Sequence, residues 1–155
     1  MNTYLLLKSL HILGIVIFLG NIITGWWKVM ADKTRNKDII IFAQRQVTLT
    51  DYIFTFGGAS LVLVTGIFNA ELHEMNYFSI NWLAWGFWLF VASGVIWVLI
   101  LIPVQIMQAK MAKDFTKEEP IPEKYWKLGK IWLYFGILAT VLPMLNLYWM
   151  VFKPT

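Results

Sequence analysis

The feature that most constrains the fold of this chain is a set of four long stretches that contain no Asp, Glu, Lys or Arg. These stretches cover residues 9–27, 52–70, 75–109 and 131–152. At 1.5 Å per residue, a helix of about 19 residues crosses a hydrocarbon core of roughly 30 Å, and each stretch is that long or longer. The sequence therefore predicts one all-α, membrane-embedded domain over residues 1–155, a four-transmembrane-helix bundle. We expect its helices at about 3–27, 50–71, 81–108 and 128–152.

The composition supports a membrane protein and excludes several kinds of site. Hydrophobic residues make up 59% of the chain and charged residues only 14%, which does not suit a soluble domain. The chain has no Cys, so disulfides, thiolate metal sites and cysteine nucleophiles are excluded. The formal net charge is +4, but the placement of the basic residues argues against nucleic acid as a partner.

The basic residues are concentrated in two segments that flank the predicted helices. All 13 Lys and Arg residues except Lys8 and Lys153 lie in residues 28–45 or 110–130. The segment between the second and third helices has none. Since positive segments stay in the cytoplasm, we expect a multi-pass protein of the bacterial inner membrane with both termini on the outer, periplasmic side. The lipid bilayer is its first expected partner.

Two connecting segments have different expected structures. In "NKDIIIFAQRQVTLTD", Asp38 can cap a helix and Ile39, Phe42 and Gln46 follow at helical spacing, which predicts an interfacial helical lead-in before the second span. In "KEEPIPEKYWK", Pro120 and Pro122 stop a helix and the charges favour water. The second segment is predicted to be a loop.

Small and polar residues recur at helical spacing within the spans, and such residues mark packing faces inside a bilayer. The first helix carries one face made of Lys8, His11, Gly14, Phe18, Asn21, Gly25 and Lys28, and the second carries Asp51, Thr55, Gly58, Val62, Thr65 and Asn69. We interpret the small residues as packing positions. Asn21 and Asn69 are each expected to make a cross-helix hydrogen bond. Asp51 is expected near the cytoplasmic interface, without a catalytic role.

His11 is the main candidate functional residue, because an ionisable group inside a span faces the bundle interior or a cavity. A neutral imidazole bonded to a neighbouring carbonyl or amide is one interpretation. Ligation or proton transfer is the other. Catalytic residues are not identifiable from the sequence, and whether the protein is an enzyme is left open.

Depth along the helices suggests partners for His11. At 1.5 Å per residue, Met144 on the fourth helix and glycines on three helices reach a similar level. An imidazole, a thioether and glycines form a slot that suits haem b or a related redox cofactor. The predicted cofactor-binding residues are His11, Met144, Gly14, Gly86 and Asn21, with His11 as the metal ligand. His73 lies roughly 13 Å higher, so bis-histidine ligation is not expected.

Four segments resemble a known bacterial family of small integral membrane proteins, domain of unknown function 2269. The resemblance rests on "LLLKSLHILG", "AQRQVTLTDYIFT", "LIPVQIMQAKMA" and "LPMLNLYWMVFKP" and spans nearly the whole chain. It implies an integral membrane protein and no particular activity.

A more distant resemblance, in the "KSLH" of the first helix and the terminal "KP", is to the four-helix, haem-associated protoporphyrinogen oxidases and to copper-resistance membrane domains. In the oxidases a histidine of the first helix is associated with haem, and it would correspond to His11. Their pattern also has a lysine early in the third helix, whereas "INWLAWGFWLF" has none. The resemblance therefore implies haem binding more readily than protoporphyrinogen oxidation.

The sequence leaves three functions open. The first is binding of haem or a similar cofactor in an outer-leaflet core around His11. The second is a cofactor-free membrane subunit or scaffold, as a homo-oligomer or part of a larger membrane complex. The third, a small transporter, has less support, because no helix carries the paired breaks of a substrate site.

Overall fold

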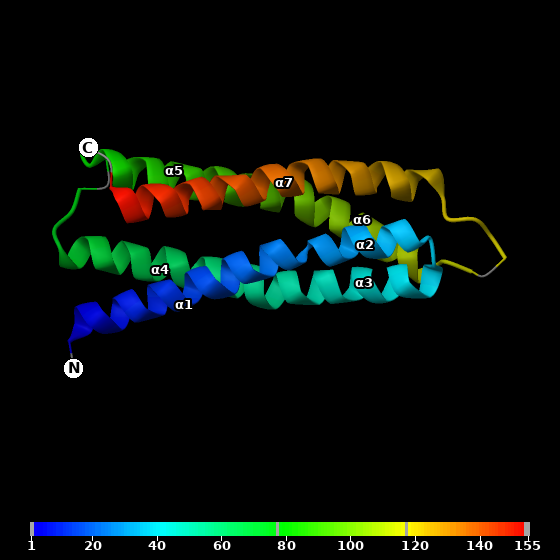
Figure 1. Cartoon of the computed structure of the whole chain (residues 1–155), viewed down its shortest axis with the longest axis horizontal. Helices are drawn as coiled ribbons and strands as arrows, with labels where there is room; N and C mark the ends of the chain where they lie inside the picture. The colour runs from blue at the N-terminus through cyan, green and yellow to red at the C-terminus, as the bar shows by residue number, and fades with distance from the viewer. Residues whose placement is uncertain (1, 77, 117, 154–155) are drawn as a thin grey trace.

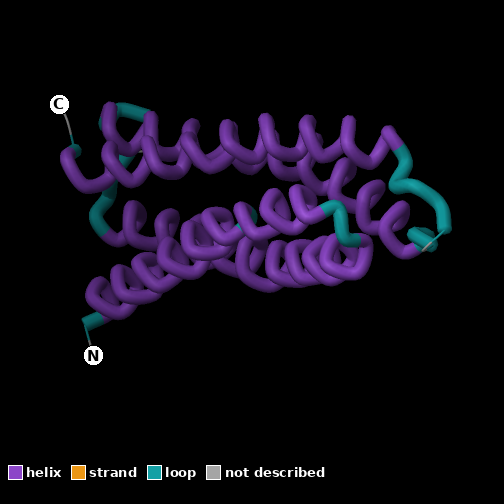
Figure 2. The backbone as a smooth tube through the Cα atoms, turned by 45° about the vertical axis from the view of Figure 1, so that its right-hand side comes forward, coloured by secondary structure: helices purple, strands orange, loops and turns teal. Residues whose placement is uncertain are grey.

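The computed structural model describes residues 2–76, 78–116 and 118–153, and within these ranges the chain is helical without strands (Figure 2). The elements are α1 (Thr3–Thr24), α2 (Trp26–Thr34), α3 (Lys37–Thr50), the π-helix η1 (Asp51–Thr55), α4 (Phe56–Leu72), α5 (Asn81–Ile96), the π-helix η2 (Trp97–Leu101), α6 (Ile102–Lys113) and α7 (Glu123–Phe152). They join end to end into four helices long and apolar enough to cross a membrane, Thr3–Thr34, Lys37–Leu72, Asn81–Lys113 and Glu123–Phe152. The predicted all-α bundle with four membrane-spanning helices is confirmed.

The four long helices form two antiparallel hairpins that lie side by side (Figure 1). Both chain termini and the connection between α4 and α5 lie at one end of the bundle, which we call the terminal half. It contains α1, α4, α5 and the second part of α7. The opposite, basic half contains α2, α3, α6 and the start of α7.

The helices extend further into the basic half than the charge-free stretches indicate. The helical lead-in expected before residue 50 is present as α3, and it continues through η1 into α4 without a break. Only Arg35, in the left-handed region with φ 53°, and Asn36 separate it from α2. The Asn36 side chain caps α3 by accepting hydrogen bonds from the backbone N–H groups of Asp38 and Ile39. Polar residues form helix here because Ile40, on the same segment, is buried in the bundle.

The predicted loop before the last helix is also found. The described residues between Lys113 and Glu123 form turns and irregular chain, and α7 starts directly after Pro122. Lys37 ties this loop to α3 by donating to the carbonyl oxygens of Thr116 and Glu119.

In the terminal half, a close backbone contact joins α1 to α4, and a side-chain hydrogen bond joins α5 to α7. A Cβ at Gly58 of α4 would lie 2.8 Å from the backbone nitrogen of Phe18, so α1 and α4 can meet this closely only at glycine. Between α5 and α7, the Ser93 hydroxyl donates to the Ala139 carbonyl oxygen at 2.8 Å. That carbonyl lacks its helical N–H partner because Pro143 follows four residues later. The predicted packing role of the small and polar residues is confirmed for these positions.

The basic half has a polar core. Lys28, only 1% exposed, forms a 2.8 Å ion pair with Asp32, and its ammonium lies 5.0 Å from the ring centre of Trp132. Tyr125 donates to the second Asp32 oxygen at 2.9 Å. The Trp132 indole N–H in turn donates to the Gln105 side chain at 3.2 Å. This network links α2, α6 and α7 at one level.

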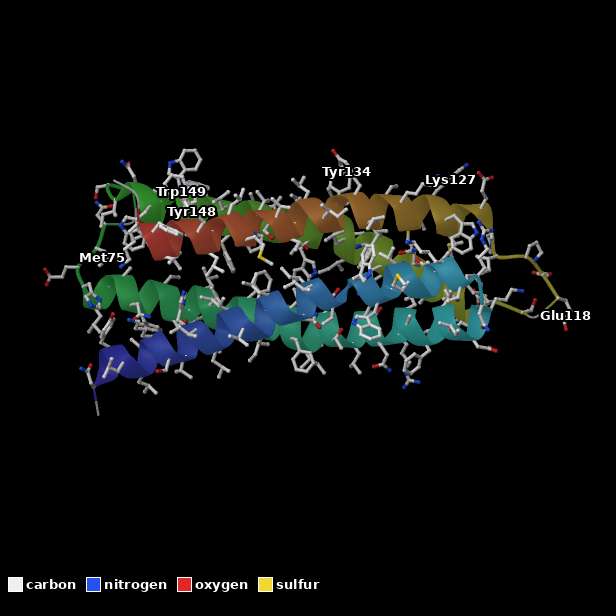
Figure 3. The ribbon with its side chains drawn as sticks, in the orientation of Figure 1. Met75, Glu118, Lys127, Tyr134, Tyr148 and Trp149 are labelled. Carbon is white, nitrogen blue, oxygen red and sulfur yellow. The ribbon has the colours of Figure 1, made fainter. Side chains whose placement is uncertain are left out.

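Many large apolar side chains lie on the outside of the bundle. Tyr134, for example, is 69% exposed and points away from the neighbouring helices (Figure 3). Such a surface suits lipid as the surrounding medium. The interior contains small residues, polar residues, two cavities and an apolar cluster made of Val47, Leu101, Val104, Leu128, Trp132 and Ala139.

Candidate functional site

The terminal cavity is a space of about 300 Å³ between the α1/α4 pair and the α5/α7 pair. The two pairs are tightly packed internally but touch each other sparingly in this half, which leaves the space between them. Most of the wall is apolar, from residues such as Ile15, Phe18, Val62 and Phe90. The polar lining residues are Tyr4, Lys8, His11, Asn69, His73, Trp82, Asn146 and Lys153.

His11 lies on the wall of this cavity with one ring nitrogen fixed. Its Nδ1 is 2.9 Å from the hydroxyl oxygen of Thr65, and that hydroxyl donates its own proton to the Leu61 carbonyl oxygen. A hydroxyl has a single proton, so in the tautomer in which Thr65 uses it for the Leu61 carbonyl, Nδ1–H of His11 is the donor to Thr65. In a neutral ring the lone pair is then on Nε2. The Cε1–Nδ1 edge of the ring faces Gly66 of α4, where a Cβ would lie 3.2 Å from Cε1 and 3.7 Å from Nδ1.

The α5/α7 wall contributes a thioether and an amide. Met150 packs against Gly86 so closely that any side chain at that position would overlap with its methyl carbon. Asn146 lies beside it, with Oδ1 2.8 Å from the place of the same Cβ. The Oδ1 atoms of Asn146 and of Asn69, on the facing α4, are buried without a hydrogen-bond partner. The cross-helix hydrogen bond expected from Asn69 is therefore not made by its oxygen, and both amides can serve a bound molecule or water.

The far end of the terminal cavity is basic and aromatic. The ammonium of Lys153 lies 4.9 Å from the Trp82 ring centre, and that of Lys8 lies 5.6 Å from the Tyr4 ring centre. Tyr4 also meets the His73 ring edge-on, with centroids 4.8 Å apart. His73 follows the His11 partner Thr65 by eight residues, about 12 Å of helix rise. The two imidazoles thus lie at different levels of one cavity.

A second, central cavity of about 350 Å³ lies nearer the basic half. The Asp51 carboxylate faces it and accepts a hydrogen bond from Asn21 at 2.9 Å and one from Thr55 at 2.9 Å. Phe18 and Phe90 line both cavities and meet edge-on at 6.1 Å between ring centres. This aromatic pair separates the two spaces.

The structure brings together only part of the cofactor site predicted from the sequence. His11 and Gly86 line the terminal cavity. Gly14 lies instead in the contact between α1 and α4, and Asn21 lines the central cavity, where it makes the cross-helix hydrogen bonds expected of it. Met144 is 37% exposed on the outside of α7 and lines neither cavity.

Met150 is the cavity methionine that depth along the helix did not identify. It lies seven residues after buried Pro143, which is two helical turns and therefore the same face. Helical spacing from Pro143 would have indicated it. Among the described residues, no three His, Asp or Glu side chains are grouped as ligands for a metal ion.

The comparisons agree with the membrane architecture. The profile of the family DUF2269, described as a predicted integral membrane protein, matches residues 5–154. No curated protein and no solved structure is significantly similar to the chain, so the resemblance to haem-associated oxidases stays a prediction. The chain belongs to the DUF2269 family of integral membrane proteins.

Proposed function

We propose that the terminal cavity binds haem b or a closely related planar redox cofactor, with Nε2 of His11 as axial ligand. The observation that carries this proposal is the His11–Thr65–Leu61 hydrogen-bond chain. It engages Nδ1 and, with Nδ1–H as the donor, would leave the lone pair of Nε2 for a ligand. An orienting partner on the second ring nitrogen is typical of metal-ligating histidines.

The other residues of the terminal cavity fit the same group. Met150, from the opposite helix pair, lines the same cavity and would supply a thioether toward the bound group in place of Met144. The ammonium groups of Lys8 and Lys153 suit the two carboxylates of haem. Asn69 and Asn146 add amides that can donate or accept, and most of the remaining wall is aromatic or aliphatic.

Haem would supply one-electron transfer at this level of the membrane. The chain itself would orient the imidazole through Thr65 and surround the group with largely apolar walls. Nothing in the terminal cavity specifies an organic substrate, and the proposal is therefore cofactor binding rather than a particular reaction.

The test is an absorption spectrum of the full chain, purified in mild detergent from haem-replete cells and, in parallel, titrated with haemin. We expect a Soret band that saturates at one haem per chain. His11→Ala should abolish it, whereas His73→Ala, at the far end of the same cavity, should keep it. A folded, colourless protein that does not saturate with haemin would contradict the proposal. It would favour the cofactor-free subunit or scaffold.

Substitutions of two methionines on α7 form a matched pair of variants that tests whether Met150 is the second ligand. Met150→Leu should shift the Soret band and convert the iron to high spin, because it removes the thioether that lines the cavity. Met144→Leu, on the lipid-facing side of the same helix, should leave the spectrum unchanged.

We also propose that the protein lies in the bacterial inner membrane with the terminal half outward. The support is the concentration of Lys and Arg in residues 28–45 and 110–130, all within the basic half. The terminal cavity would then lie in the outer leaflet.

A further inference from the structure

Three interruptions of the helices meet at the central cavity. Gly25, between α1 and α2, lines it directly. The π-helix η1 contributes Asp51 and Thr55, and the π-helix η2 contributes Trp97 and Leu101. Single-turn π-helices occur frequently at functional sites, and irregular backbone at membrane depth is tolerated where it lines a cavity. Because all three interruptions border the central cavity, we interpret it as a candidate binding site rather than a gap in the packing.

Asp51 gives the central cavity a carboxylate that no basic residue balances. Its hydrogen-bonding neighbours are Asn21, Thr55 and Gln105, which are all neutral. Among the described residues, none forms an ion pair with it. A carboxylate inside a span is costly unless a positive charge compensates it, and such residues mark ligand sites by default.

The rest of the wall suits an organic cation rather than a metal ion. Five aromatic rings line the cavity, those of Phe18, Trp26, Phe90, Trp97 and Trp132. Trp132 and Trp26 already lie 5.0 Å and 5.5 Å from the ammonium groups of Lys28 and Lys33, so Trp97 is the main indole for a ligand. Aromatic faces attract ammonium and phosphonium groups through their quadrupole, and indole is the best of them. Most of the remaining lining is aliphatic, from side chains such as Ile22, Val47 and Leu133. Such a wall suits a ligand that has large apolar substituents and one positive charge.

We infer that the central cavity is a binding site for an amphiphilic organic cation, with Asp51 as its counter-charge and the tryptophans as its aromatic walls. The ligand class is a monovalent quaternary ammonium or phosphonium with apolar substituents. This site does not depend on haem binding, because it is separated from His11 by the Phe18–Phe90 pair and uses different polar residues.

The first test measures binding of tetraphenylphosphonium to the full chain in lipid nanodiscs by equilibrium dialysis. We expect saturable binding that Asp51→Asn weakens at least tenfold. Asp38→Asn, an exposed carboxylate at the start of α3, should leave it unchanged. Uncharged triphenylphosphine oxide should bind the wild type and Asp51→Asn equally weakly. Absence of binding to the wild type, or equal affinity of Asp51→Asn, would overturn the inference.

A second variant keeps the test decisive if Asp51→Asn fails to fold. Gly136 lines the central cavity, and a Cβ there would meet no atom within 4 Å. Gly136→Leu should fold and block tetraphenylphosphonium by filling the cavity. Gly20→Leu, where a Cβ is equally unobstructed but no cavity is lined, is the matched control. Full binding by Gly136→Leu would place the cation elsewhere, and His11→Ala should leave cation binding intact whatever its effect on haem.

Discussion

Nδ1 of His11 and the hydroxyl oxygen of Thr65 lie 2.9 Å apart, across the contact between α1 and α4. With Nδ1 engaged by this bond, Nε2 is the ring nitrogen that we propose for a ligand. Removal of the bond should therefore act on cofactor affinity through the orientation of His11. Thr65 itself is 3% exposed, so it acts from behind the ring rather than at the ligand.

Thr65→Val should weaken haem binding about 10- to 100-fold, the usual effect of removing a partner that orients a metal-ligating histidine. Valine keeps the shape of threonine and loses the acceptor oxygen. Haemin titration measures the affinity, and Thr65→Ser should restore most of it. Equal affinities of Thr65→Val and wild type would show that the hydrogen bond has no part in ligation.

Gly58→Ala should destabilise the bundle by about 1–3 kcal/mol, the usual cost of forcing an extra group into a packed contact. The new methyl group would lie 2.8 Å from the backbone nitrogen of Phe18, which cannot move without shifting α1. Unfolding in mixed micelles, followed by circular dichroism, measures the change. The adjacent Gly57→Ala has no atom within 4 Å of its Cβ and should be neutral or slightly stabilising.

Lys28→Met should cost about 3–5 kcal/mol of unfolding free energy, because it leaves the mostly buried Asp32 carboxylate without its cation. The double variant Lys28→Met/Asp32→Leu should recover much of the loss. The exposed pair Lys127–Glu123, with 3.2 Å between its charged atoms, offers the comparison: Lys127→Met should change stability by less than about 1 kcal/mol. Similar losses for both single variants would argue against a special role of the polar core in the basic half.

A reporter fused after Thr155 tests the orientation. Alkaline phosphatase, which is active only outside the cytoplasm, should be active there and inactive when inserted at residue 119, in the loop before α7. The reverse pattern would place the terminal cavity in the inner leaflet and contradict the positive-inside assignment.

The sequence was most informative where helical periodicity and hydrophobic length decide the outcome. Gly14, Phe18 and Lys28 were assigned to one buried face by spacing alone, and all three are buried. The helical lead-in before the second span was predicted from its spacing, whereas the continuation of the first helix to Thr34 was not, because these turns contain charged residues and still form helix.

The depth of a residue along its helix did not predict which way its side chain points around the helix. Met144 was assigned to the cofactor site from its depth, but it lies about 100° around α7 from buried Pro143, and Met150 occupies the inward face instead. The π-helices were also not predicted. Pro103, which follows η2, lacks the N–H that a regular helix would donate to Leu99, so a wider turn there has a local cause. The sequence offers no comparable signal at Asp51.

The glycine contact at Gly58 joins α1 and α4 into one closely packed helix pair, and α5 and α7 form the second pair. The polar core of the basic half connects the two pairs, and they have few contacts with each other in the terminal half. A molecule bound in the terminal cavity would therefore lie between two helix pairs. Any change in the width of the cavity would require each pair to rotate as a unit about the basic half.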